Sequence, residues 1–112
     1  MPTVADALAA IDSIDLPATT LMWPNGKAPT PPYAVLVPHG DAGQVADGRM
    51  HYRARSYDIE LYTRAYDPPL MRRLEVALDE AGILAKPGDV ATDEVNRFAV
   101  AYYSLTLVEQ EG

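Results

Sequence analysis

The stretch RMHYRARSYDIELYT, residues 49–63, decides the fold more than any other part of this chain. It is long enough for one β-strand of about fifteen residues, where strands usually have about five or six. Its alternating pattern changes in the middle. In the first half the odd-numbered positions are basic, at Arg49, His51, Arg53 and Arg55. In the second half the odd-numbered positions are apolar, at Tyr57, Ile59 and Leu61.

A strand points successive side chains to opposite faces, so this change requires either a bulge or a change in what covers each face. We place the change near Arg55–Ser56. On this interpretation the first half turns its basic side chains to solvent, and the second half lies in a hydrophobic core with Asp58 and Glu60 outside it. The pattern predicts a strand that extends beyond its own domain, as in a protein that assembles with copies of itself.

The bulk properties indicate a single globular domain over residues 1–112, with 48% hydrophobic and 22% charged residues. The absence of cysteine excludes disulfides, a thiolate nucleophile and Cys-based metal sites. The N-terminal residues do not resemble a signal peptide, and no apolar run approaches the roughly 20 residues of a membrane span. The net charge of −7 argues against nucleic acid as the main partner, since phosphate binding favours basic proteins.

The first half of the chain contains signals for one helix and a hairpin. Thr3 and Asp6 form a capping-box pattern, so we expect a helix over residues 4–13. A short strand is predicted at 19–23, followed by a turn at 24–26, and a clearer strand at 33–37. The polar, glycine-containing segment Gly40–Gly48 then forms a loop. We expect this loop to join the strand at 33–37 to the long strand as an antiparallel hairpin.

The second half contains a helix and a closing strand. Asp67 and Pro68 predict a helix start, and Gly82 predicts its end. The apolar stripe of this helix is Leu70, Leu74, Ala77, Leu78 and Ala81. A short strand is predicted at 83–85, a turn at 86–89 and a final strand at 97–108 that is apolar on both faces, which predicts that both faces are covered.

Together these elements predict an α+β fold in which two helices pack on one face of a mostly antiparallel sheet with a long β-hairpin, in the order α-β-β-α-β-β. The aromatic residues, Trp23 and seven tyrosines among them, suit either an interface or an ordinary core, and the sequence favours neither.

Two groups of polar residues are candidates for chemistry. His39 and His51 flank a loop that contains Asp41 and Asp47, a combination that suits a metal site or an acid–base pair. We favour a polar surface loop, because a metal site needs three or four converging ligands. Asp58 and Glu60 lie on one strand face, and we favour surface ion pairing over a paired-carboxylate site. The expected ion-pair partners are Arg53, Arg55 and Arg64.

The basic stripe of the long strand has three interpretations: contact with nucleic acid, contact with an acidic surface of a neighbouring copy, or a simple solvated face. The acidity of the chain favours the last two. The sequence contains no phosphate-binding glycine motif, no HExxH and no GxSxG. No residue set therefore supports an enzyme, and we expect a protein without catalytic activity.

In order, the segments resemble the small tail-terminator and head–tail joining proteins of long-tailed bacteriophages. The pattern begins at Pro32-Tyr33 and has its centre at YDIELYT, residues 57–63, which resembles a "Y-x-I/V-E-L-Y-T" strand of that group. It continues through Asp67 and the segment 78–83, and closes on a strand similar to "E-x-x-Y/F-x-V-x-Y" at Glu94–Tyr103. Residues 32–108 are covered, whereas residues 16–31 have no counterpart in the pattern.

The resemblance implies a structural protein of the virion that forms a ring, typically six-fold, at the head-proximal end of the tail tube. Such a ring ends tube polymerisation and joins the tail to the head. The implied partners are further copies of the chain, the tail-tube protein and a head-completion or connector protein, with DNA passing through without specific binding. No cofactor, metal or membrane is implied, and the chain is expected in the host cytoplasm before assembly.

The parts most able to reach a neighbour are the basic half-strand and the loop before it. The expected contacts with another subunit or the tube are Asp41, Gln44, Asp47, Arg49, His51, Arg53 and Arg55. Three alternatives stay open: a head–tail connector or stopper protein, a small binding or regulatory module of the host, and a small hydrolase with its site in the Gly40–Gly48 loop. A regulatory module is expected to be a monomer or dimer.

Overall fold

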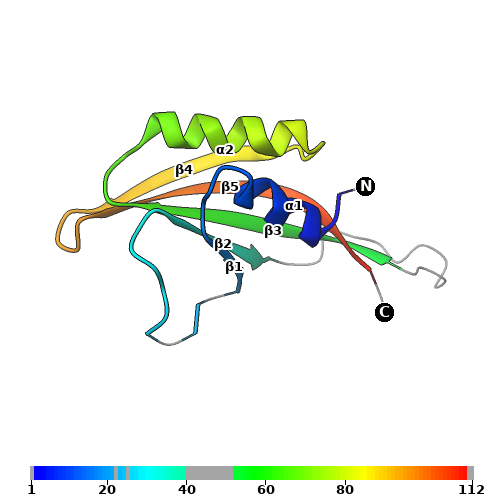
Figure 1. The fold of residues 1–112 in the computed structure, drawn as a ribbon, viewed down its shortest axis with the longest axis horizontal. Helices are drawn as coiled ribbons and strands as arrows, with labels where there is room; N and C mark the ends of the chain where they lie inside the picture. Colours follow the sequence, from blue (N-terminus) through cyan, green and yellow to red (C-terminus); the bar gives the residue numbers. More distant parts are fainter. Residues whose placement is uncertain (1, 22, 25, 40–51, 111–112) are drawn as a thin grey trace.

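Two helices lie over one face of a five-stranded sheet (Figure 1). The computed structural model describes residues 2–21, 23, 24, 26–39 and 52–110. In chain order the elements are α1 (Val4–Asp12), β1 (Ala18–Thr20), β2 (Tyr33–Pro38), β3 (Tyr52–Thr63), α2 (Pro68–Glu80), β4 (Lys86–Asp93) and β5 (Phe98–Gln110). The predicted α+β class is confirmed, with β1 as one strand more than the predicted order contained.

The sheet has the strand order β1-β2-β3-β5-β4. The strand β1 pairs with β2 in parallel, and every other pair is antiparallel. The predicted hairpin of β2 and β3 is confirmed, with Tyr33 opposite Tyr62 and Val37 opposite Asp58. The long strand β3 lies in the centre of the sheet, because β5 pairs with its other edge along its whole length.

The change of pattern in β3 comes from a change in how deeply one face of the strand is buried, and not from a bulge. Its register with β5 is continuous from Tyr52 opposite Gln110 to Thr63 opposite Ala99. The odd-numbered positions therefore share one face throughout, because side chains alternate strictly in an unbroken strand. On that face Tyr57 is buried beneath the helices, whereas Arg55 is only half-buried. Leu107, which is opposite Arg55 on β5, is still fully buried in the core, so on this face the cover decreases along β3 before it decreases along β5.

The first helix begins with the predicted capping box. The Thr3 backbone N–H donates to Asp6 Oδ2 at 2.9 Å, and the Asp6 N–H donates to Thr3 Oγ1 at 3.1 Å. Both bonds use backbone donors that a helix start leaves without intrahelical partners. The helix buries Ala7, Ala10 and Ile11 against the sheet and α2.

The second helix has the predicted start and end. The Leu70 N–H donates to the side chain of Asp67 at 3.2 Å, and Pro68 occupies the first turn. At the other end Gly82 has φ of 77°, and the Ile83 N–H donates to the Leu78 carbonyl at 2.9 Å. This is the bonding of a glycine-terminated helix, in which a left-handed residue returns the chain to the core. The buried stripe ends at Leu78, because Ala81 is the exposed C-cap.

We expect Asp67→Ala to lower the free energy of unfolding by about 1 kcal/mol, because the first turn of α2 loses its capping acceptor. Urea denaturation measures the change. The matched control is Asp79→Ala, an exposed carboxylate in the last turn of the same helix, where removal of a negative charge should cause no loss. Equal losses for the two variants would contradict the capping role.

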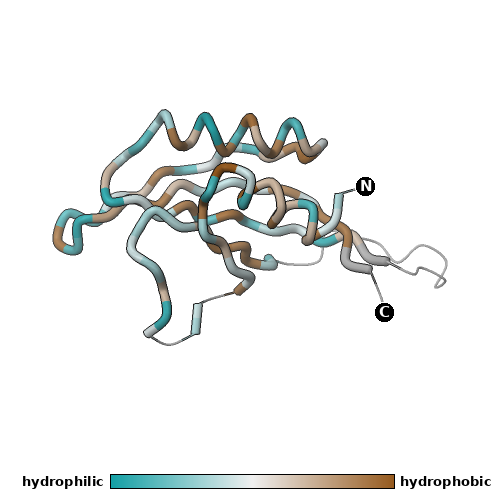
Figure 2. Tube along the Cα trace, viewed as in Figure 1, coloured by the Kyte–Doolittle hydropathy of each residue, from teal (hydrophilic) through white to brown (hydrophobic). Residues whose placement is uncertain are grey.

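The core lies between the helices and the odd-numbered face of β3 and β5. Figure 2 shows hydrophilic and hydrophobic positions alternating along α2, as expected for a helix with one buried face. The Tyr103 ring is 1% exposed, and its hydroxyl donates to Glu75 Oε2 at 2.8 Å. Burial, and then the hydrogen bond to Glu75, raise the pKa of Tyr103 well above its ordinary value of 10.0. This bond links β5 to α2.

The Tyr103 hydroxyl predicts a loss of stability at alkaline pH. Because its pKa is raised in the folded chain, its contribution is complete below pH 10 and decreases as the pH rises further, by up to about 1.4 kcal/mol per pH unit. Urea denaturation between pH 8 and 11 measures the slope. Tyr103→Phe should reduce that slope, although Tyr62, whose pKa burial also raises, continues to contribute. An unchanged slope in the variant would overturn this assignment.

The segment after α2 differs from the prediction. Residues 83–85 form no strand, and the predicted turn at 86–89 is the beginning of β4. Pairing with β5 overrides the local turn chemistry there, at the expense of a register shift between Pro87 and Val90. Gly88 lies against β5 in this bulge, where an added Cβ would come 3.3 Å from the Tyr102 carbonyl oxygen.

The second face of β5 is covered only in part. Val100 and Val108 are buried, Phe98 and Tyr102 are half-buried, and Ser104 and Thr106 are exposed. Both helices lie on the other side of the sheet (Figure 1). The prediction that both faces are fully covered is therefore wrong for the half of the strand that contains Ser104 and Thr106.

Candidate interaction surfaces

At one end of the sheet β3 continues past β2 and pairs with β5, whose Val108 also bridges Thr3 before α1. The strand β2 pairs with β3 only from Tyr57 to Tyr62, and the bond from the His39 N–H to the Ser56 carbonyl, at 2.9 Å, lies just beyond this paired stretch. Residues 52–56 of β3 then pair with residues 106–110 of β5. We call these two segments the arm; Figure 1 shows the far ends of β3 and β5 running out past the helices.

Two of the predicted contact residues lie in the arm, and five lie outside the described residues. Arg53 is opposite Glu109, and Arg55 is opposite Leu107. Arg55 is half-buried beside the fully buried Leu107, so it is not fully solvated. The residues outside the described part are Asp41, Gln44, Asp47, Arg49 and His51.

The two carboxylates of β3 have partners other than those predicted. Asp58 Oδ1 lies 3.9 Å from His39 Nε2 and accepts a hydrogen bond of 3.4 Å from the Ser104 hydroxyl. Glu60 accepts a 2.8 Å bond from the Tyr62 hydroxyl. The predicted ion pairing with Arg55 is wrong, because even- and odd-numbered positions of an unbroken strand lie on opposite faces.

The other partners proposed for His39 lie outside the described residues. Among residues 2–21, 23, 24, 26–39 and 52–110, no group of three or more His, Asp or Glu side chains could hold a metal ion.

A stack of half-buried aromatic rings lies on the sheet face away from the helices. The Tyr33 and Tyr62 rings are stacked with centroids 5.0 Å apart, Trp23 meets Tyr33 edge-on at 6.0 Å, and Phe98 lies 6.1 Å from Tyr62. Burial and the bond to Glu60 raise the pKa of Tyr62. These contacts attach to the sheet the segment before β2, which has no counterpart in the family pattern and in which the predicted strand at 19–23 is found as β1, Ala18–Thr20.

The β4–β5 hairpin ends in a tightly bonded turn. The Asp93 carboxylate accepts from the backbone N–H groups of Val95 and Asn96, both at 3.0 Å, and from the Asn96 amide at 2.8 Å. These bonds lower the pKa of Asp93, with the Asn96 backbone bond as the largest cause. Val95 is 89% exposed at the end of this turn, and Arg97 follows with φ of 60°.

We expect Asp93→Ala to loosen the hairpin end, because three hydrogen bonds lose their acceptor. Amide hydrogen exchange at Val95 and Asn96 should become faster than in the parent chain. Since the pKa of Asp93 is lowered, the same loosening should occur in the parent chain as the pH falls below 3.8, the ordinary value for this group. Asp89→Ala, in the exposed part of β4, is the control and should leave both rates unchanged.

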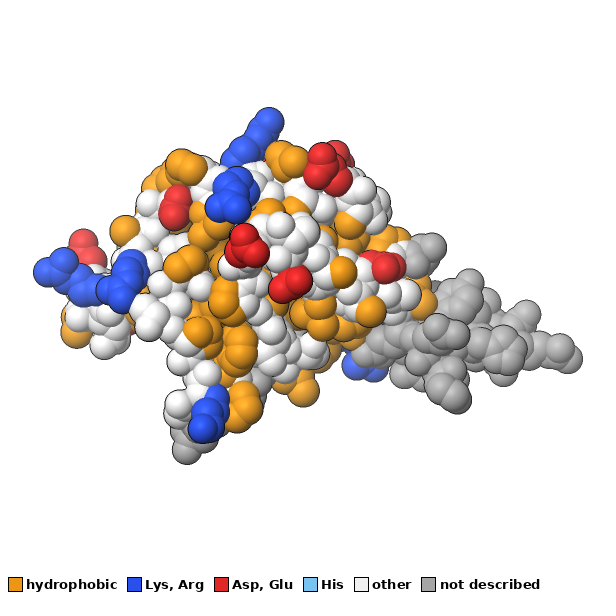
Figure 3. Space-filling model, in the orientation of Figure 1, with side chains coloured by type: hydrophobic (Ala, Val, Ile, Leu, Met, Phe, Trp, Pro, Cys, Tyr) orange, Lys and Arg blue, Asp and Glu red, His pale blue; other side chains and the backbone are white. Residues whose placement is uncertain are grey.

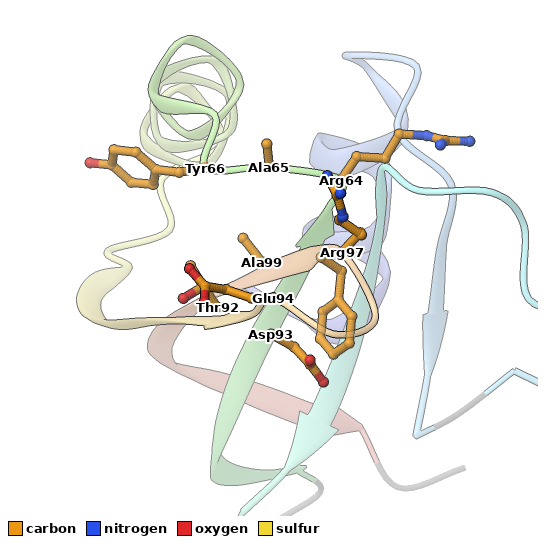
Figure 4. A pocket seen from close by; sticks show the side chains of 9 residues that line it. Arg64, Ala65, Tyr66, Thr92, Asp93, Glu94, Arg97 and Ala99 are labelled. Atoms are coloured by element: carbon orange, nitrogen blue, oxygen red, sulfur yellow. The ribbon is translucent and has the colours of Figure 1, made fainter.

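An open hollow of about 510 Å³ lies beside this turn, between the end of β3 and the hairpin. Figure 4 shows that its polar side chains do not converge: Tyr66 and Arg64 point in opposite directions, and Asp93 and Glu94 point apart. A catalytic or ligand-binding centre requires polar groups aimed at a common point.

A second hollow of about 370 Å³ lies between the outer side of α2 and the beginning of β4. Two exposed apolar side chains line it, Leu84 at 88% and Val76 at 42% exposure. The charged residues around it are Arg72, Glu75 and Asp79. This groove was not predicted from the sequence, because residues 83–85 have the pattern of a short strand and form none. On the face seen in Figure 3, hydrophobic surface lies between separate acidic and basic side chains.

Comparisons with known proteins leave the family open. A scan of the sequence against models of protein families finds no match, and a search of curated proteins finds none either. Neither helix in the described part of the chain is long and apolar enough to span a membrane.

Proposed function

We propose that this protein is a structural component of a phage-type virion: a tail terminator that forms a ring, six-fold in the commonest arrangement, at the head-proximal end of the tail tube. The ring ends tube polymerisation and joins the tail to the head. Its partners are its own copies, the tail-tube protein and a head-completion protein. The chain waits in the host cytoplasm until assembly. It needs no cofactor and catalyses no reaction.

The observation that carries this proposal is the arm. Residues 52–56 and 106–110 continue β3 and β5 past the stretch where β2 pairs with β3. The β5 strand of the arm is joined to the domain, because the Val108 N–H donates to the Pro2 carbonyl at 2.9 Å and Leu107 is fully buried in the core. The projecting part is therefore the far end, where Tyr52 pairs with Gln110 and Arg53 with Glu109. Two strands without further cover are marginally stable in water, so this end gains from packing on another surface. The far end of the arm is therefore the described part of the chain suited to reach a neighbouring subunit or the tube.

The shape of the subunit supports a ring over a two-fold dimer. The arm and the β4–β5 hairpin project from opposite ends of the sheet (Figure 1). Unlike surfaces at opposite ends favour head-to-tail contacts, and head-to-tail contacts close into rings when the rotation between subunits permits it. The excess of 16 acidic over 9 basic residues suits the wall of a DNA conduit, since carboxylates repel the passing phosphates.

Electron microscopy of tail tubes assembled with and without the purified chain tests the proposal. With the chain present, the tubes should stop growing and should carry a ring at one end only. Light scattering on the chain alone identifies the competing class, because a regulatory module gives a monomer or dimer and leaves the tube ends bare. Rings that bind portal complexes but not tube ends would instead identify a head–tail connector.

A further inference from the structure

The two most exposed large apolar side chains of the described residues lie at opposite ends of one strand. Val95 is 89% exposed and follows β4, whereas Leu84 is 88% exposed and precedes it. An eight-residue strand is about 26 Å long. The chain therefore carries an apolar knob, Val95, at one end of β4 and an apolar groove, lined by Leu84 and Val76, at the other.

The knob is held rigidly. The three hydrogen bonds to the Asp93 carboxylate fix the turn that presents Val95. Glu94 precedes Val95 and Arg97 follows it two positions later, and both side chains are exposed. The tip thus presents a negative charge, an apolar side chain and a positive charge in a fixed order. A preordered surface loses little conformational entropy when it binds.

The groove offers the complementary set. Its apolar floor includes Val76, Ile83 and Leu84, and its volume of about 370 Å³ leaves room for a valine side chain with its neighbouring backbone. Arg72 and Asp79 supply one charge of each sign at its rim, and both are exposed. Glu75 already accepts the hydrogen bond from Tyr103.

We propose that the hairpin tip of one copy docks in the α2–β4 groove of the next copy. Val95 packs on Leu84 and Val76, Glu94 faces Arg72, and Arg97 faces Asp79. The occupant is a second copy because the knob and the groove, with matching charges, lie on the same chain. The contact joins unlike surfaces, so it repeats from copy to copy until a ring closes. The closing of copies into a ring rests on the proposed function, whereas the contact between two copies does not.

Mixing two variants tests the contact. Val95→Asp places a charge on the knob, and Leu84→Asp places a charge in the groove. Both side chains are nearly fully exposed, so the fold should be unaffected. Sedimentation velocity should show that each variant alone needs at least about tenfold higher concentration to associate than the parent chain. An equimolar mixture should form a dimer that grows no further, because one intact knob meets one intact groove.

The control variant is Leu21→Asp, a side chain 59% exposed at the end of β1, far from both surfaces in sequence, which should associate like the parent chain. Melting curves of all three variants confirm that they fold. Association of Val95→Asp and Leu84→Asp at the parent concentration would overturn the proposal. A mixture that stays as monomeric as its components would overturn it equally.

Cross-linking provides a second measurement, and the absence of native cysteine makes it specific. A chain carrying both Val95→Cys and Leu84→Cys should give a ladder of disulfide-linked oligomers on mild oxidation, whereas either single substitution should give no ladder. If no ladder forms but rings still appear on tube ends, the docking contact is wrong and the proposed function stands. If neither ladders nor rings form, both are wrong.

Discussion

Shortening the arm by two residues on each strand should abolish tail completion while the domain stays folded. The variant lacks Tyr52 and Arg53 from β3 and Glu109 and Gln110 from β5, which are opposite one another in the sheet. Removing two residues from each strand preserves the alternation of side chains. The free energy of unfolding should change by about 1 kcal/mol or less, since these residues are the last paired positions of β3 and β5.

The readout is the proportion of tail tubes that end in a ring, counted by electron microscopy, with urea denaturation as the test of folding. A control chain of full length carries Arg53→Gln and Glu109→Gln, which neutralises the opposing charges but retains the reach. If the length of the arm is the property that matters, the full-length control should cap tubes normally and the shortened chain should not. Normal capping by the shortened chain would remove the main support for the proposed function.

Leu74→Ala should lower the free energy of unfolding by about 2–5 kcal/mol, because it leaves a cavity where α2 meets the core. Leu74 is fully buried and belongs to the cluster that includes Ile11, Ile59 and Leu78. A loss of this size is a large part of the stability of a domain of this length. Thermal and urea denaturation at low protein concentration measure it without a contribution from association.

The matched control is Val76→Ala on the same helix. Val76 is 42% exposed, so its truncation should change the free energy of unfolding by no more than about 0.5 kcal/mol. The comparison tests which face of α2 meets the sheet. Similar losses for both variants would show that the helix is packed differently.

The helices could be predicted from the sequence because their signals are local. The capping box of Thr3 and Asp6, the start at Asp67 and the end at Gly82 all involve residues within a few positions of one another. The central strands were predictable from their alternation over many residues. The strand β4 was missed because Lys86-Pro87-Gly88-Asp89 has the composition of a turn, and only pairing with a distant strand, β5, makes it extended.

The candidate surfaces could be predicted only in part. The length of the basic and aromatic stretch indicated a long strand, and β3 continues past its neighbour β2. That the strand extends beyond its own domain to meet another copy stays a prediction, since β5 pairs with β3 along its whole described length. The hairpin tip and the α2–β4 groove could not be predicted, because a single valine in a polar turn and one leucine after a helix have no periodicity. Their exposure depends on how β4 packs, and that is decided by contacts between residues far apart in the sequence.

The bulge in β4 limits how copies of this chain can polymerise. An edge strand with a free backbone ladder is a template on which other extended chains add without limit. Here the register shift between Pro87 and Val90 interrupts that ladder, and Pro87 has no N–H to donate. Amyloid-like growth along this edge is therefore disfavoured, because an added strand would find no continuous ladder across the bulge.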